Sequence, residues 1–366
     1  MLKKDSSLPK SEYLLASRRA YSMPNLHDIN DILETVNLTF SEDNIENILK
    51  NRFDINLTQE IKEKIEKSGF STNRKINIKN NSHLEKYKEL LISLEIEILS
   101  NASKEREDLL KYLERKGLKE DKKIAIIDIG HNGSLQKNLK KLLNKDISGY
   151  YFMTFLGAKT LLEEGSIVKG YLSNFEDNII SYHPYCKNIG MFEFLFLPPE
   201  DTFIKFYDED PIFVNLNESK RKELSTELHR GIINFSKNYL KVINGDLSYI
   251  NYSPARAIRN YIAYLKEPGK ADASMLKNVY FVDLFGGRAK RYLIDRQNYK
   301  KVTNKNYTNY LQDSWWREGA AALINNKEIS IKNRINKNSE LSSFQRKLRK
   351  LKRSPLEFFR DMKVFK

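Results

Sequence analysis

The stretch KIAIIDIGHNGSLQKNLKKLLNKDISGYYFMTF, from Lys123 to Phe155, decides the fold class of this chain. Its first part, Lys123–Asp128, is a continuous apolar run, which is typical of a strand buried on both faces of a parallel sheet. Leu135–Leu143 has the spacing of an amphipathic helix, and Gly149–Phe155 is a second strand-like run. A strand, a helix and a second strand in this length predict a β–α–β unit of a Rossmann-like α/β protein.

The turn after the first strand has the residues of an anion-binding cradle. Gly130 and Gly133 permit a tight turn, and the N–H groups of Gly133, Ser134 and Leu135 begin a helix whose amino end favours negative charge. Asp128 ends the strand, at the edge where open α/β sheets bind ligands. This arrangement predicts binding of a phosphate or carboxylate.

Two side chains of this turn are candidates for acid–base catalysis or for a hydrogen bond to the ligand. Asp128 suits a hydrogen bond to a sugar hydroxyl or a general base, and His131 suits an acid, a base or a hydrogen-bond donor. Asn132 and Gln136 are counted with the phosphate- or sugar-binding residues. An ordinary strand–helix turn with Ser134 as its N-cap explains the same residues, so that alternative stays open. The spacing fits neither a haloacid-dehalogenase nucleophile motif nor a GxGxxG dinucleotide fingerprint.

A pair of arginines near the amino terminus is a second candidate. Ser17, Arg18 and Arg19 follow an apolar stretch, and two adjacent guanidinium groups beside a hydroxyl can grip a phosphate. The alternative is that the pair lies on a solvated face.

Three further residues are weighed as site residues. Glu193 lies in an apolar run and is either a paired structural acid or a catalytic carboxylate with a raised pKa. Trp316 and Arg317 suit stacking on a sugar ring, with core packing as the alternative. The single cysteine, Cys186, excludes a disulfide framework, and its spacing from His183 predicts no metal site.

The whole chain divides into four regions. Residues 1–120 are the helical amino-terminal part, 121–290 the Rossmann-like core with insertions, 291–340 a helical part, and 341–366 a basic tail. Periodicity predicts helices over Asp28–Val36, Asn44–Lys50, Gln59–Lys67, Leu84–Leu99, Lys104–Lys116 (capped by Ser103), Leu135–Leu143, Asn217–Ile243 and Ser253–Leu265, and extended segments over Met191–Leu197, Thr202–Phe206 and Asn278–Leu284.

The charge of the chain is unevenly distributed. The net charge is +15, and Phe344–Lys366 contributes +7 of it with nine basic and two acidic residues. This amphipathic tail suits an anionic membrane surface or a docking partner. The remaining surplus is mild, and no nucleic-acid partner is expected. The amino terminus lacks a signal-peptide h-region, and no apolar run approaches the ~20 residues of a spanning helix, so we expect a cytoplasmic protein.

Two short blocks resemble a known family. YLLASRRA, and later IAIIDIGHNGSLQ with a GYY strand, are similar to bacterial surface-polysaccharide proteins described as predicted haloacid-dehalogenase-superfamily hydrolases, often joined to glycosyltransferases. The similar part is the Rossmann-like module after their phosphatase-like domain. Asp128, Gly130, Gly133, Ser134 and Gln136 match, while His131 replaces a common aromatic.

Other parts of the chain extend this resemblance. Asn188–Pro198 is similar to a later block whose acidic residue would be Glu193, and Arg346–Asp361 resembles the end of many capsule and lipopolysaccharide glycosyltransferases. The Arg-Asp-Gly segment and phosphatase-like domain that usually precede the SRR block are not in this chain.

The resemblance implies a role in capsule or lipopolysaccharide biosynthesis at the inner face of the cytoplasmic membrane. The substrate would be a nucleotide-activated or phosphorylated sugar, with a glycan acceptor, and either a glycosyltransferase or a sugar-phosphate hydrolase fits. No cofactor is evident, and metal dependence is open. The alternative is a non-catalytic or truncated partner of a glycan-synthesis complex.

Overall fold

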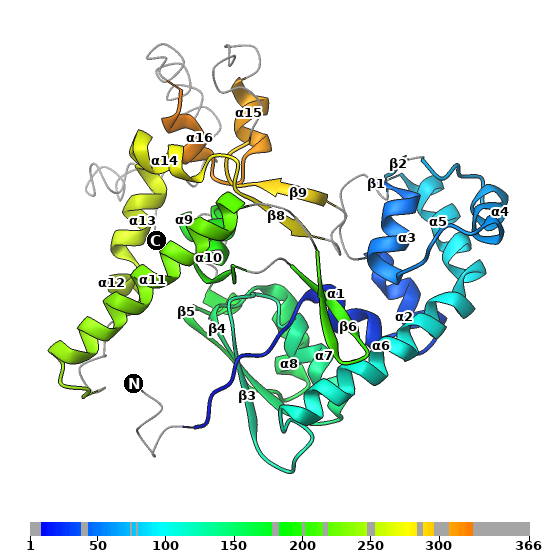
Figure 1. The fold of residues 1–366 in the computed structure, drawn as a ribbon, viewed down its shortest axis with the longest axis horizontal. Coiled ribbons are helices and arrows are strands. Elements are labelled where there is room, and N and C mark those ends of the chain that lie inside the picture. Colours follow the sequence, from blue (N-terminus) through cyan, green and yellow to red (C-terminus); the bar gives the residue numbers. More distant parts are fainter. Residues whose placement is uncertain are drawn as a thin grey trace, which may run out of the picture.

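The computed structural model describes residues 9–37, 43–73, 75–77, 80–177, 183–199, 202–214, 219–246, 253–283, 288–295 and 307–324. Within these residues the chain forms a helical amino-terminal lobe, a parallel sheet with its helices, and a mostly helical carboxy-terminal lobe (Figure 1). The predicted α/β class with a Rossmann-like unit is therefore confirmed.

The parallel sheet has three strands and two crossover helices. The strands lie side by side in chain order, and the first crossover confirms the predicted β–α–β unit. Ile124 pairs with Ile147, and Gly149 pairs with Val168. The elements are β3 (Ile124–Asp128), α7 (Ser134–Leu143), β4 (Ile147–Met153), α8 (Lys159–Glu163) and β5 (Val168–Ser173).

Only one face of this sheet is well covered. Ile124 and Ile126 of β3 pack against Leu139 of α7 in one apolar cluster, whereas Ile127 on the other face is 91% exposed. The expectation that β3 is buried on both faces is therefore wrong for the described residues. The strand order explains this, because successive right-handed crossovers in one direction place α7 and α8 on the same side of the sheet.

The amino-terminal lobe packs five helices around one apolar cluster that runs from Met23 to Ala102. Three of its predicted helices are confirmed with small shifts at their ends, whereas the predicted helix Leu84–Leu99 is divided at Leu94 into the end of α5 and the start of α6. The elements of this lobe are α2 (Ile29–Glu34), β1 (Asp43–Asn44), α3 (Ile45–Phe53), α4 (Gln59–Lys67), β2 (Lys75–Ile76), α5 (Asn81–Ser93) and α6 (Glu95–Arg115).

Helix α6 differs from the sequence prediction. It runs without interruption from Glu95 to Arg115, so Ser103 lies inside the helix and the predicted cap there is wrong. Gly117 ends it as predicted, with a φ of +67° that favours glycine. This long helix joins two clusters, because Ala102 packs in the amino-terminal lobe and Leu113 packs beside the sheet.

Two small elements connect the amino-terminal lobe to the sheet. Helix α1 (Arg18–Ser22) packs on α7, and the antiparallel hairpin of β6 (Phe203–Tyr207) and β7 (Asp210–Phe213) packs on α1 and α6. The Tyr112 ring stacks on Phe206 with centroids 4.3 Å apart. The predicted extended segment at Thr202–Phe206 is thus confirmed as β6.

The carboxy-terminal lobe has a core around the fully buried Trp316. The predicted long helix is confirmed as α11, and a break at Ile258 divides the next one into α12 and α13. The elements are α9 (Pro184–Lys187), α10 (Ile189–Phe196), α11 (Ser219–Val242), α12 (Pro254–Ala257), α13 (Arg259–Lys266), α14 (Lys270–Leu276), β8 (Tyr280–Asp283), β9 (Arg288–Tyr292), α15 (Tyr307–Asp313) and α16 (Arg317–Ala322).

The segment Met191–Leu197 is a helix, so its prediction as an extended segment is wrong. A run of seven mostly apolar residues has no period that separates a strand from a buried helix. Here Met191 and Phe194 face the core of the carboxy-terminal lobe, while Phe192 reaches the end of the sheet. The helix therefore has apolar partners on two sides.

No helix among the described residues is long and apolar enough to cross a membrane. The basic tail predicted at 341–366 lies outside the described residues.

Candidate functional site

The candidate site lies at the carboxyl edge of the sheet, in the turn between β3 and α7. The Oδ1 atom of Asp128 accepts a hydrogen bond from the Gly130 N–H at 2.8 Å. The chain reaches Gly133 with a φ of +68°, and a Cβ atom there would lie 2.5 Å from Cδ1 of Leu161. Both the backbone conformation and the close approach of α8 therefore require glycine at 133.

The amino end of α7 has no side-chain cap. Its N-cap residue is Gly133, and Ser134 is the first helical residue, so the predicted alternative of Ser134 as N-cap is wrong. The first-turn N–H groups of a helix have no partner within the helix. Together with the helix dipole, these donors form a site of positive potential beside Asp128.

Burial raises the pKa of Asp128 above its usual range. The Gly130 and Ile129 N–H groups act in the opposite direction by stabilising the carboxylate. A carboxyl group with a raised pKa at a sheet edge exchanges protons closer to neutral pH than an exposed aspartate does. Its charge also raises the pKa of the neighbouring Tyr151, after the larger effect of burial.

His131 is buried and neutral. Its ring stacks on Phe155 with centroids 4.6 Å apart, and its Nε2 atom lies 2.8 Å from Oη of Tyr185. Burial lowers the pKa of His131 to about 4. Among its predicted roles, that of a hydrogen-bonding group in the wall of the site fits this geometry, because a neutral imidazole keeps one N–H donor but lacks the second proton that an acid gives at pH 7.

The turns that follow the three strands are joined by hydrogen bonds. The Phe155 N–H donates to the His131 carbonyl at 2.7 Å, which ties the turn after β4 to the turn after β3. Thr154 connects to the third turn, because its Oγ1 accepts a hydrogen bond from the Phe175 N–H at 3.1 Å. Asn132 is exposed, and its side chain lies against Gly157 in the same group of turns.

Tyr185 is a central residue that sequence reasoning missed. It is fully buried in α9, contacts His131, and has its pKa raised by burial and then by the charge of Glu193. The charge of Glu193 in α10 therefore acts on Tyr185, the residue that contacts His131. The SYHPYC segment was the available signal, but a lone tyrosine in a short loop has no spacing that reveals its partner.

Gln136 is occupied by the protein itself. Its Nε2 donates to the carbonyls of Ile147 at 2.6 Å and Ile167 at 3.0 Å, and its Oε1 accepts from the Tyr151 hydroxyl at 2.8 Å. A Cβ atom on Gly149 would lie 2.0 Å from that Oε1, so Gly149 makes room for the amide. Gln136 therefore fastens α7 to the sheet, and the structure does not support its predicted contact with a sugar or phosphate.

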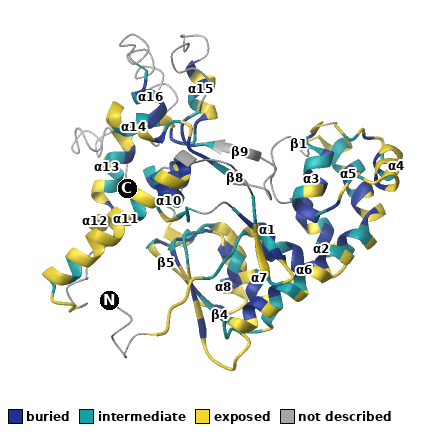
Figure 2. Ribbon diagram, viewed as in Figure 1, coloured by how far each residue is buried: buried dark blue, intermediate teal, exposed yellow. Residues whose placement is uncertain are grey.

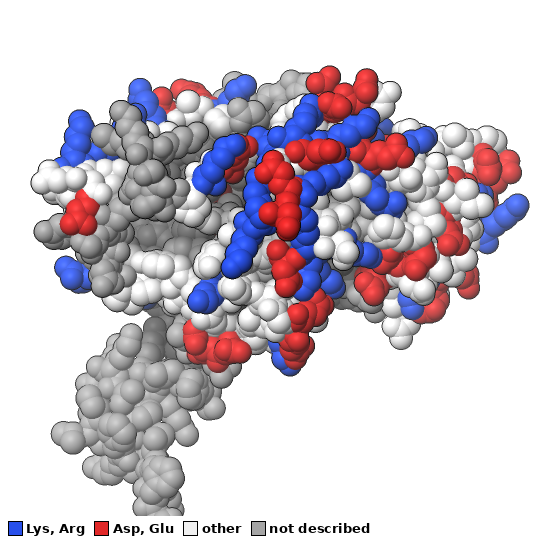
Figure 3. Space-filling model, turned by 90° about the horizontal axis from the view of Figure 1, so that it is seen from below, with Lys and Arg blue, Asp and Glu red and all other residues white. Residues whose placement is uncertain are grey.

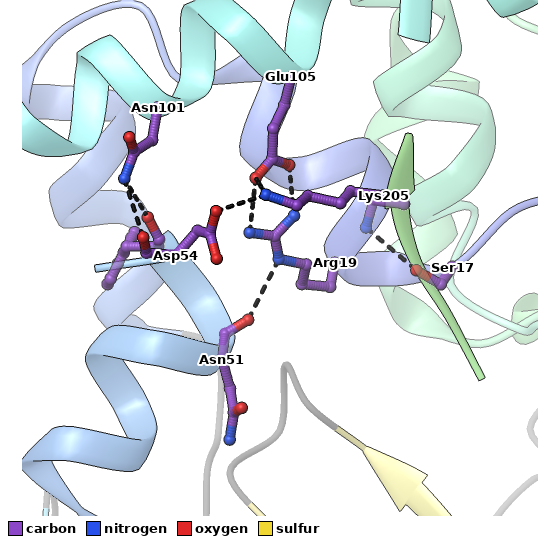
Figure 4. Close-up of polar contacts among 9 residues, drawn as sticks. Ser17, Arg19, Asn51, Asp54, Asn101, Glu105 and Lys205 are labelled. Carbon is purple, nitrogen blue, oxygen red and sulfur yellow. Dashed lines mark hydrogen bonds and ion pairs between the residues drawn. The ribbon is translucent and has the colours of Figure 1, made fainter. Parts of the chain in front are cut away.

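Arg19 is likewise a structural residue. Its guanidinium forms a bidentate ion pair with Glu105 of α6, and its Nε donates to the Asn51 carbonyl at 3.1 Å (Figure 4). Arg19 is 2% and Glu105 6% exposed. Lys205 of β6 reaches both Glu105 and Asp54, which caps α3 (Figure 4). Phosphate binding by Arg19 is therefore not supported, because its donors are used inside the protein.

The neighbours of Arg19 have different positions. The Ser17 Oγ accepts a hydrogen bond from the Ala20 N–H at 3.0 Å and so caps α1. Arg18 is exposed, on the solvated face that the sequence left open as an alternative.

Trp316 lies in the core of the carboxy-terminal lobe. Its side chain is fully buried, and its Nε1–H donates to the Leu265 carbonyl at 3.1 Å. The core-packing alternative is therefore the correct one, and stacking of Trp316 on a sugar is excluded by burial. Arg317 is exposed and begins α16, so it does not share a site with Asp128 (Figure 1).

The described residues contain no group of three or more His, Cys, Asp or Glu side chains that could hold a metal ion. A shallow hollow of about 340 Å³ opens at the opposite, amino-terminal edge of β3, lined by Lys122, Lys145 and their neighbours. This hollow is separate from the turn between β3 and α7. The surface seen from below mixes both signs of charge, as Figure 3 shows.

No protein-family model, curated protein or solved structure matches this chain. The resemblance to surface-polysaccharide proteins therefore stays a prediction based on the two motifs quoted above.

Proposed function

We propose that this protein binds a phosphorylated or nucleotide-activated sugar at the carboxyl edge of β3, β4 and β5. One observation carries the proposal: a carboxyl group with a raised pKa and an uncapped helix amino end lie in one glycine turn. The first-turn N–H groups of α7 would hold the phosphate. Asp128 would hold a sugar hydroxyl or move its proton, since a carboxylate would repel the phosphate itself.

The surrounding residues would shape this site. The neutral His131 and the Tyr185 hydroxyl form a hydrogen-bonded wall beside the turn. Glu193, whose charge acts on Tyr185, is the second acidic candidate. Arg19 and Gln136 are not proposed as ligand-binding residues, because their donors are hydrogen-bonded within the protein. They would support the site by holding α1 and α7 in place.

The biological setting that we propose is capsule or lipopolysaccharide biosynthesis at the inner face of the cytoplasmic membrane. The two motifs and the basic segment 344–366 support it. A glycosyltransferase and a sugar-phosphate hydrolase both fit a phosphate cradle with a nearby acid.

A second candidate function is that of a non-catalytic partner in a glycan-synthesis complex. The open sheet face favours it, because Ile127, Tyr150 and Tyr171 are exposed on a surface that parallel sheets normally cover. β3 is also an edge strand among the described residues. A partner protein would complete both the face and the edge.

Ligand titration with matched variants separates these functions. We expect binding of a nucleotide sugar or sugar phosphate by the wild type, with turnover abolished by Asp128→Asn. The control is Asp121→Asn, an exposed aspartate at the other edge of the sheet. Binding by the wild type without any turnover, which also survives Asp128→Asn, supports the non-catalytic partner. Absence of binding across a panel of nucleotide sugars and sugar phosphates contradicts the sugar-binding proposal.

A further inference from the structure

The outer half of α11 is an amphipathic surface that is exposed to solvent in the described part of the chain. The inner half of the helix packs on the body, where Leu224 and Leu228 join the carboxy-terminal core and Ser225 donates to the Leu197 carbonyl at 2.6 Å. Beyond this contact the helix extends away from the body and is exposed (Figures 1 and 2). Its apolar stripe nevertheless continues to the end.

The stripe on this outer half is built from large side chains at helical spacing. Phe235 is 71%, Val242 80% and Ile232 37% exposed. Phe235 also stacks on Tyr239, with centroids 6.1 Å apart. Residues 232, 235, 239 and 242 repeat every three or four positions and so share one side of the helix. Exposed aromatic and aliphatic groups in one stripe mark an interaction surface.

The basic charge on the opposite side of α11 and on the neighbouring helices points to the partner. Lys237 and Lys241 of α11 and the basic residues of α12 and α13 are exposed. Residues 231–266 contain five basic side chains and one acidic side chain, Asp246. A second copy of this chain would bring these like charges together, which opposes self-association. An anionic lipid surface instead satisfies both the charges and the apolar stripe.

We propose that residues 229–242 of α11 bind the surface of an anionic lipid bilayer. The helix would lie in the plane of the interface, with Phe235 and Val242 among the acyl chains and Lys237 and Lys241 at the headgroups. This surface is separate from the carboxy-terminal segment 344–366. The inference does not depend on the sugar chemistry proposed for the β3–α7 turn.

Sedimentation of the full chain with lipid vesicles tests this inference. We expect binding to vesicles of phosphatidylcholine with phosphatidylglycerol, weaker binding at high salt, and little binding to pure phosphatidylcholine. Phe235→Ser with Val242→Ser should weaken the partition by on the order of tenfold or more, because two large apolar side chains leave the membrane. Lys237→Glu with Lys241→Glu should weaken it comparably.

Matched controls come from the amino-terminal lobe. Ile96→Ser removes an apolar side chain that is 82% exposed, and Lys62→Glu with Lys67→Glu reverses two exposed charges on α4. These controls should bind vesicles as the wild type does, and circular dichroism should show native helix content in every variant. Undiminished binding by both α11 variants would assign the contact to another segment and overturn the inference. A dimer that the Phe235 and Val242 substitutions dissociate would also overturn it.

Discussion

At the scale of single residues, the candidate ligand-binding side chains differ in whether their polar groups are already hydrogen-bonded inside the protein. Arg18 and Arg19 are adjacent in sequence, yet Arg19 is buried against Glu105 and Arg18 is exposed. The sequence predicts the pair but not this division, because Glu105 lies 86 positions away. Gln136 is a similar case, since the carbonyls that occupy its amide belong to residues outside its own turn.

The Arg19–Glu105 ion pair predicts a large difference between the two arginines. Arg19→Ala should lower the free energy of unfolding by about 3–5 kcal/mol, because it removes both guanidinium contacts of the buried Glu105 and leaves it only the Lys205 ammonium at 3.9 Å. Arg18→Ala should change it by less than about 0.5 kcal/mol, as is usual for exposed positions. Urea denaturation of both variants measures the difference. Equal effects would mean that the pair is not buried in solution.

The buried His131 predicts a pH dependence of stability. The pKa is about 4 in the folded protein and about 6.5 in an unfolded chain. Between these values the unfolded chain binds the proton more readily, so stabilisation present above about pH 6.5 is lost as the pH falls toward 4. This loss amounts to roughly 3 kcal/mol for the wild type. Denaturation of His131→Gln should show a correspondingly smaller loss, and parallel pH profiles would contradict the assignment.

At the scale of elements, the pattern of the chain predicts β3, α7 and β4 well because their periods are distinct and a glycine turn separates them. The helix α10 escapes prediction because a short apolar run has no diagnostic period. The prediction of a cap at Ser103 is wrong because the neighbouring residues continue the helix through that position. Tertiary packing decides both cases.

The turn between β3 and α7 predicts a specific role for Gly133. Gly133→Ala combines a left-handed backbone conformation with a Cβ atom 2.5 Å from Leu161. Gly165→Ala is the matched control, because its φ is +81° and nothing lies within 4 Å of the added atom. We expect the control to cost about 1 kcal/mol of unfolding free energy and Gly133→Ala to cost more. Thermal or urea unfolding compares them, and equal costs would contradict the close approach of α8.

At the scale of the whole molecule, the described residues form a Rossmann-like unit in which helices cover one sheet face, while on the other face Phe152 packs on α10 and Ile127, Tyr150 and Tyr171 are exposed. Neighbouring residues of β3 test this directly. Ile126→Ala should cost about 2–5 kcal/mol of unfolding free energy because Ile126 packs against α7 and α6. Ile127→Ala should cost less than about 0.5 kcal/mol because that side chain is 91% exposed. A large loss in Ile127→Ala would show that the open face is covered in solution.

The open face and the exposed half of α11 could not be predicted from the sequence. The apolar run of β3 is the same whether one or both faces are covered, and the order of strands that decides this arises only from the three-dimensional path of the chain. The net charge of +15 likewise does not show where the basic residues lie in the fold. It identifies an excess of basic residues, while the structure locates part of that excess along α11 to α13.

The central claim is that a sugar phosphate or nucleotide sugar binds in the turn between β3 and α7. Hydrogen–deuterium exchange with and without such ligands measures this most directly. The account predicts slower exchange of the backbone amides of residues 130–136 when ligand is present, and no such protection in Asp128→Asn for ligands that need its carboxylate. Protection at another part of the chain, with these amides unchanged, would contradict the account.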